Sequence, residues 1–189
     1  MTATVQTFPA TVAERFAELD RARMALLAEL GDGSVEPPPS AEPGRWSIGE
    51  IAYHLHLVES RITGLLMMVL SSDTRQERAG EEKLRAEWEL TISRATDPKI
   101  RANAPAGTIP ENAPRLAETL ALLEKSRSQL LAALQSVTID DLASVSAPHP
   151  VEAIGKLTGA GWLSLIAHHE IRHTRQIREL KERRSTTPA

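Results

Sequence analysis

The stretch "SLIAHHEIRHTRQIREL", residues 164–180, has the residue types and spacing of a metal-binding helix. Three of the chain's six histidines, His168, His169 and His173, fall within six positions of it. Neutral imidazole is the commonest protein ligand for transition metals such as zinc, nickel and iron. His169 and His173 stand four residues apart, which places them on one helix face about 5–6 Å from each other. This spacing suits two ligands of one metal ion.

A third candidate ligand, His54, belongs to another predicted helix at about residues 47–70. It lies within the arc of apolar residues around Ile51 that forms the inner face of that helix. Burying three imidazoles without a shared partner would leave several polar groups unsatisfied. We therefore predict that His54, His169 and His173 hold one divalent transition metal, with zinc, nickel and iron all open.

Other polar residues of the last helix have predicted roles beside this site. Gln176 lies near the ligand face and is predicted to hydrogen-bond close to the metal, with an interior helix contact as the alternative. Glu170 lies about 100° from His169 around the helix. It is the candidate catalytic residue, as a base or an orienting group, and a solvated surface carboxylate is the alternative. The remaining histidines are predicted to be solvated or loop residues: His56, His149 and His168.

The letters "HEIRH" at 169–173 also match the HExxH pattern of zinc proteases, with Glu170 as general base. The longer metzincin motif fails, because Gln176 stands where it needs Gly and Glu179 where it needs His. No strand pattern precedes the helix to bind an extended peptide substrate. These two features argue against a protease.

Composition excludes several classes of protein and of chemistry. Hydrophobic residues make up 41% and charged residues 25% of the 189 residues, as in soluble globular proteins. The absence of cysteine excludes disulfides, thiolate ligands and thiol nucleophiles from the chain. A net charge of −3 gives no basic surface for nucleic acid. Without a signal peptide or an apolar run of roughly 20 residues, we expect a cytoplasmic protein without membrane or nucleic-acid partners.

The elements that must position the histidines are predicted to be helices. Alanine, leucine, glutamate and arginine dominate, and aromatic residues are only 3%. Arg23 interrupts the apolar stripe of the first helix, where its stem could pack while its charged head reaches water. Proline-rich stretches at about 98–115 and 146–161 are predicted to be irregular. Amphipathic periodicity predicts helices at about 11–30, 47–70, 115–137 and 161–183, with a further charged helix at about 76–95.

We predict a single all-α domain over 1–189, a four-helix bundle. The connection at residues 71–113 is long enough to cross the bundle, so the third long helix can run parallel to the second. Up-down-down-up topology is therefore favoured over a simple up-and-down bundle. This arrangement allows the second and fourth helices to be neighbours, which would bring His54 to the level of the histidine pair.

Two segments, "RWSIGEIAYHLHLVE" at 45–59 and "GWLSLIAHHEIRHTRQIREL" at 161–180, flank the proline-rich crossover. In this combination the chain resembles the DinB/YfiT-like superfamily over about Phe16 to Leu180. The resemblance implies a four-helix bundle of up-down-down-up topology, often a homodimer. It also implies a divalent metal bound through one histidine of the second helix and an HxxxH pair of the fourth. The matching residues are His54, His169 and His173.

Some members of that superfamily are transferases or isomerases that use low-molecular-weight thiols such as mycothiol or bacillithiol, and others are described as metal-dependent hydrolases. The resemblance therefore implies a metal-dependent transferase that acts with such a thiol on a small-molecule substrate. The alternatives are a non-catalytic metal-binding bundle for stress response or metal sensing, and a metal-dependent hydrolase. An enzyme needs an open coordination position, whereas a structural site has a fourth protein ligand. The sequence offers no obvious fourth inward histidine.

Overall fold

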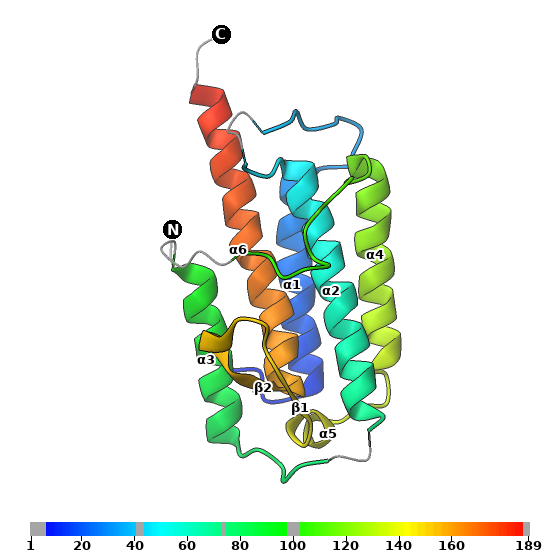
Figure 1. Cartoon of the computed structure of the whole chain (residues 1–189), viewed down its shortest axis with the longest axis vertical. Helices are drawn as coiled ribbons and strands as arrows, with labels where there is room; N and C mark the ends of the chain where they lie inside the picture. Colours follow the sequence, from blue (N-terminus) through cyan, green and yellow to red (C-terminus); the bar gives the residue numbers. More distant parts are fainter. Residues whose placement is uncertain (1–6, 41–43, 73–74, 98–102, 187–189) are drawn as a thin grey trace.

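The computed structural model describes residues 7–40, 44–72, 75–97 and 103–186, and this part of the chain is mostly helical (Figure 1). The helices are α1 (Val12–Leu30), α2 (Ile48–Leu70), α3 (Glu81–Thr96), α4 (Leu116–Ala133), α5 (Ile139–Ala143) and α6 (Gly159–Thr186). A short hairpin of β1 (Ser146–Pro148) and β2 (Lys156–Thr158), with a 3-10 turn at Glu152–Ile154 between its strands, precedes α6. No helix in the described ranges is long and apolar enough to cross a membrane.

Local sequence signals fix where the first two helices begin. The Thr11 hydroxyl accepts a hydrogen bond from the Glu14 backbone N–H at 3.2 Å, and the Glu14 carboxylate accepts one from the Thr11 N–H at 2.9 Å. Ser47 and Glu50 form the same reciprocal pair at the start of α2, at 3.2 and 2.7 Å. Both capping boxes satisfy backbone donors that the first turn leaves free. The second box fixes the starting point of α2, the helix that carries the first candidate ligand.

α1 and α6 pack side by side and run in the same direction. Near the start of both helices, Arg15 Nη1 donates to Ser164 Oγ at 2.7 Å. Near their other ends, Arg178 pairs with Glu29 at 2.8 Å.

α2 and α4 are also parallel to each other. The Glu36 carboxylate, ahead of α2, accepts a hydrogen bond from the Leu116 N–H at the start of α4. Further along both helices, Glu59 pairs with Arg127 at 2.7 Å. Figure 1 shows α1 and α6 rising while α2 and α4 descend, which is the up-down-down-up order.

The long connection between α2 and α4 contains α3, which packs against α6 on the outside of the bundle. After α3, residues 103–115 return across α6 and α2 to the start of α4 (Figure 1). This return segment, residues 103–115, contains no helix or strand. It places Thr108, which is buried, next to α2.

The core consists of two apolar clusters separated by a polar layer. The larger cluster includes Leu19, Ile62, Leu66, Trp88, Leu130 and Leu163. The smaller cluster includes Leu26, Ile51, Leu55, Leu123 and Ile177. Between these levels, each long helix contributes one buried charged residue, namely Arg23, Glu59, Arg127 and Glu170. The bundle is therefore polar at mid-height, where the candidate site lies.

Some predicted boundaries differ from the structure. α3 begins at Glu81 rather than about 76, and α4 ends at Ala133 rather than about 137. The short helix α5 follows with its own capping box, formed by Thr138 and Asp141. The stretch at 146–161, predicted to be irregular, contains the hairpin and the first turn of α6. Strands of three residues are too short to show an alternating pattern in the sequence.

Candidate metal centre

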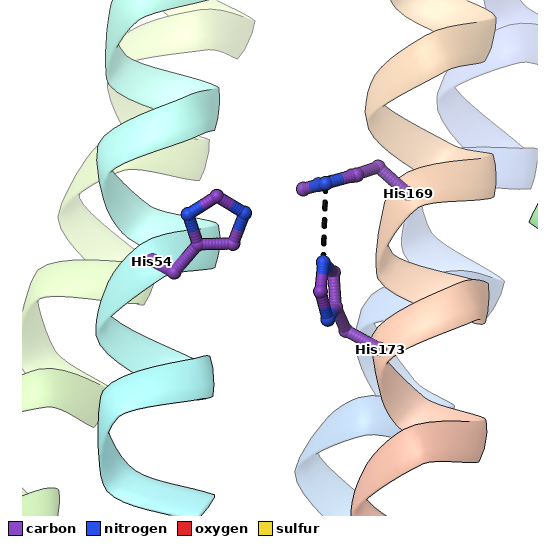
Figure 2. Close-up of side chains that lie close together, drawn as sticks. All are labelled: His54, His169 and His173. Carbon is purple, nitrogen blue, oxygen red and sulfur yellow. Dashed lines mark hydrogen bonds between the residues drawn. The ribbon is translucent and has the colours of Figure 1, made fainter. Parts of the chain in front are cut away.

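Three histidines meet between α2 and α6 at the middle of the bundle. Figure 2 shows His54 pointing from α2 towards His169 and His173, which point back from successive turns of α6. The ring centroid of His54 lies 5.1 Å from each of the other two, and the centroids of the α6 pair lie 4.5 Å apart. The Nε2 atoms of His169 and His173 are 3.2 Å apart. The structure thus brings together the three residues that the sequence assigned to one site.

Hydrogen bonds at the outer nitrogens of two rings leave their Nε2 atoms as acceptors. His54 Nδ1 lies 2.6 Å from the Thr108 carbonyl oxygen, which can only accept, so this nitrogen carries the proton. His173 Nδ1 donates in the same way to Gln176 Oε1 at 2.8 Å. Partners of this kind fix the tautomer and the orientation of a metal-binding imidazole. Gln176 is thus hydrogen-bonded to one of the three candidate ligands.

His169 differs from the other two rings. Its Nδ1 is buried and has no hydrogen-bond partner within the described part of the chain. The residue is nevertheless partly exposed, whereas His54 and His173 are buried.

Burial keeps these imidazoles neutral. The pKa of His173 falls to about 3, because burial and the nearby His54 both oppose its positive form. Burial lowers the pKa of His169 well below its usual range, and the neighbouring histidines lower it further. Burial also lowers the pKa of His54, although its bond to the Thr108 carbonyl opposes the shift. Neutral rings with free lone pairs are the form that binds a metal.

The donor set fits a divalent transition metal. The candidate ligand atoms of His54, His169 and His173 all lie within 4.8 Å of one another. Two imidazole nitrogens of a tetrahedral zinc site stand about 3.3 Å apart, so the widest separation in the group would have to shrink by at most about 1.5 Å. No fourth histidine, aspartate or glutamate in the described ranges joins it. Three neutral ligands and an open side are typical of catalytic metal sites.

A family model of the DinB superfamily matches residues 15–177, which include all three histidines. The chain belongs to the DinB superfamily. The resemblance noted in the sequence is thereby confirmed. The histidine triad is thus a feature of a DinB-superfamily bundle.

Similarity to individual proteins agrees with this membership. The chain is 30% identical over 158 residues to the uncharacterized protein YuaE of Bacillus subtilis (strain 168), a match that covers 83% of this chain and 89% of YuaE. It also resembles the crystal structure of TT2238, a four-helix bundle protein, with a TM-score of 0.52 and 25% identity. That match covers 88% of this chain and 96% of the other. Both comparisons extend over most of the DinB-superfamily chain.

Glu170, the predicted catalytic residue, lies in the interior of the bundle. It is 2% exposed, so the alternative of a solvated surface carboxylate is wrong. Its Oε1 accepts hydrogen bonds from Arg23 Nε at 2.9 Å and Arg127 Nη2 at 3.2 Å. Burial raises the pKa of the Glu170 carboxyl, although both arginines oppose the shift. The structure does not bring this carboxylate into the group of metal-ligand atoms.

Arg23 was predicted to extend its charged head to water, and this prediction is wrong. The side chain is 9% exposed, and its guanidinium group bonds to carboxylates of α2 and α6. Glu59 of α2 is buried as well. The partners of Arg23 and Glu59 lie on other helices, so the periodicity of one helix could not reveal them.

His168 was predicted to face solvent, but it is 1% exposed. Its Nδ1 lies 2.8 Å from Thr91 Oγ1, and its Nε2 lies 3.2 Å from Glu18 Oε1. The Trp88 indole N–H also donates to Glu18. α3 covers this side of α6, and the position of α3 in the bundle could not be predicted from the sequence. His168 is thus a hydrogen-bonded core residue, separate from the metal site although it precedes His169 directly.

The other two histidines lie outside the site. His56 and His149 are half-buried, and His149 lies in the turn of the hairpin, as predicted for a loop residue. The role of Thr108 could not be predicted from the sequence, because a backbone carbonyl has no residue-type signature. The ring of Trp46 lies 4.7 Å from that of His54.

Proposed function

We propose that this DinB-superfamily protein binds a divalent transition metal through His54, His169 and His173 and acts as a transferase with a low-molecular-weight thiol. The observation that carries the proposal is the convergence of three neutral imidazoles with no fourth protein ligand among the described residues. A divalent cation held there would lower the pKa of a bound thiol or water towards neutrality. Neutral ligands suit this task because they do not reduce the charge of the cation.

The residues around the triad supply orientation rather than a nucleophile. Thr108 and Gln176 hold two of the rings through their Nδ1 atoms, and Trp46 packs beside His54. The chain has no cysteine, so the sulfur must come from a co-substrate. In such a transfer the thiol proton leaves to solvent and the sulfur bonds to an electrophilic carbon. The leaving group of that carbon departs with its electron pair.

The test is a panel of thiols on protein whose bound metal has been identified by elemental analysis. Mycothiol, bacillithiol and glutathione would each be offered with one model electrophile, and product would be followed by mass spectrometry. We expect turnover with at least one thiol, and none in the His169→Ala/His173→Ala double variant. No turnover across the panel by stoichiometrically loaded protein would favour a non-catalytic metal-binding bundle. Equal turnover by the double variant would show that the reaction does not use the site.

A further inference from the structure

A buried network of charges joins all four long helices at the level of the metal site. Arg23 of α1 donates to Glu59 of α2 at 2.7 Å and to Glu170 of α6 at 2.9 Å. Arg127 of α4 donates to the same two carboxylates, at 2.7 and 3.2 Å. Ser126 adds a hydrogen bond to Glu59 at 2.6 Å. Each of the four charged side chains is at most 9% exposed.

The two carboxylates of this network stand on the two helices that carry the candidate ligands. Glu170 follows His169 directly in α6, and Glu59 lies little more than one turn beyond His54 in α2. The arginines come from α1 and α4, which contribute no residue to the histidine group. The ligand helices are therefore held on their other faces by helices outside the site.

Such a connection restricts rotation of the ligand helices. A planar guanidinium bonds to carboxylates in a fixed fork geometry, so each carboxylate has few alternative positions. If α6 turned by about 20° around its axis, a ring nitrogen some 7 Å from that axis would move by roughly 2 Å. That distance is about the length of a metal–nitrogen bond. Small rotations would therefore separate His54 from the α6 pair.

Stability alone does not account for the use of charges at these positions. Well-packed apolar side chains often stabilise a core as well as, or better than, a buried ion network of similar volume. A network of directional bonds also holds the helices that it joins in one defined relative position.

We propose that Arg23 and Arg127, acting through Glu59 and Glu170, position the three histidines for metal binding. This inference rests on the proposed metal site. It makes Glu170 a positioning residue rather than the catalytic residue that its place beside His169 first indicated.

The experiment compares two buried arginines of α1 that both contact α6. Arg15, the matched control, is 1% exposed and donates to Ser164 Oγ and to the Ala160 carbonyl, but it is not bonded to Glu59 or Glu170. Wild type, Arg23→Met and Arg15→Met would be titrated with Co²⁺ while the visible absorption bands of the ion are recorded. Urea unfolding of the metal-free proteins would be measured in parallel.

We expect both substitutions to lower the urea midpoint, because each removes buried hydrogen bonds. Only Arg23→Met should weaken Co²⁺ binding, by about 10-fold or more, and shift the absorption bands. Arg15→Met should bind within about 2-fold of wild type with unchanged bands. If Arg23→Met does not fold, Arg23→Lys takes its place, because lysine keeps the charge but loses the fork. It should weaken binding less and shift the bands in the same direction.

The outcomes separate this inference from the proposed function. Wild-type affinity and unchanged bands in the Arg23 variants would overturn the positioning role and leave the metal site standing. Equal effects of the Arg23 and Arg15 substitutions would also overturn it, since a general loss of stability would then explain both. Failure of the wild type to bind Co²⁺ at the histidines would overturn both proposals.

Discussion

Two polar regions share α6, and they differ in the partners that the fold supplies to their buried groups. Around Glu170, two arginines and two carboxylates compensate each other's charge within the core. Around His169 and His173, the Nε2 atoms of two neutral rings lie at hydrogen-bond distance, 3.2 Å apart, and the ring of His54 faces both rings. A buried polar group that finds its partners within the fold is most simply structural. Three neutral imidazoles that converge, one of them with a buried Nδ1 that has no partner among the described residues, indicate a ligand from outside the chain.

The largest expected difference between the two regions is in metal content. The double substitution His169→Ala/His173→Ala should abolish bound metal, because only one imidazole of the triad remains. Elemental analysis after loading and desalting measures this directly. The matched change Glu170→Gln should retain bound metal, with at most weakened affinity. Unchanged stoichiometry in the double alanine variant would place the metal elsewhere.

The charge network should dominate the stability of the metal-free fold. Glu59→Ala leaves two buried guanidinium groups short of a carboxylate, and we expect a loss of about 3–5 kcal/mol in the free energy of unfolding. Urea unfolding measures the loss, with the exposed Glu89→Ala as control, for which about 0.5 kcal/mol or less is expected. Similar losses for the two variants would mean that the network contributes little to stability.

The pH dependence of stability should distinguish the two regions in metal-free protein. The folded-state pKa of His173 is about 3, below the value near 6.5 of an unfolded imidazole, so the unfolded state binds more protons in between. Stability should therefore fall as pH decreases from 6.5 towards 3, by up to about 1.4 kcal/mol per pH unit for this group. Urea unfolding of wild type and His173→Leu at pH 7, 6 and 5 would reveal the difference in slope.

Glu59 should contribute in a lower pH range. Burial opposes its ionisation, but Arg23 and Arg127 outweigh burial and lower its pKa. The stability that this carboxylate provides is present above the unfolded-state value near 4.5, and it is lost as pH falls through the lower folded-state value. A Glu59→Gln variant should therefore keep the wild-type slope between pH 6.5 and 5. A shallower slope there would assign the acid sensitivity to the network.

Adjacent histidines provide a smaller test. His168→Ala removes a partner of the buried Glu18 carboxylate and should reduce stability by about 1–3 kcal/mol without changing metal stoichiometry. His169→Ala should weaken metal binding instead. Loss of metal in the His168 variant would mean that the two sides of α6 are not independent.

The smallest expected effect concerns the start of α2. Ser47→Ala removes the side-chain acceptor for the Glu50 N–H and should lower stability by about 1 kcal/mol. Because His54 lies two turns further along, metal affinity should stay within about 2-fold of wild type if the network holds α2 in place. Thermal unfolding with a parallel metal titration measures both effects. A larger loss of metal affinity would show that the cap helps to position His54.

The sequence predicted those features that depend on the periodicity of one helix. The apolar arc around His54 and the i, i+4 spacing of the α6 pair were sufficient to select the three histidines. Prediction from the sequence failed where the partner of a residue lies on a distant segment. His168 was assigned to solvent because the position of α3 was unknown, and Arg23 because Glu59 and Glu170 are remote in sequence. The Thr108 carbonyl was missed because hydrogen bonding by the backbone does not depend on residue type.

The central claim is that three imidazoles from α2 and α6 bind one metal ion and leave part of its coordination sphere open. X-ray absorption at the zinc edge of protein loaded with one equivalent of zinc tests this most directly. We expect three imidazole ligands and at least one light-atom ligand from solvent, and one imidazole fewer in His54→Ala. A zinc ion with fewer than three imidazoles in the wild type, or a spectrum unaltered by His54→Ala, would contradict the account.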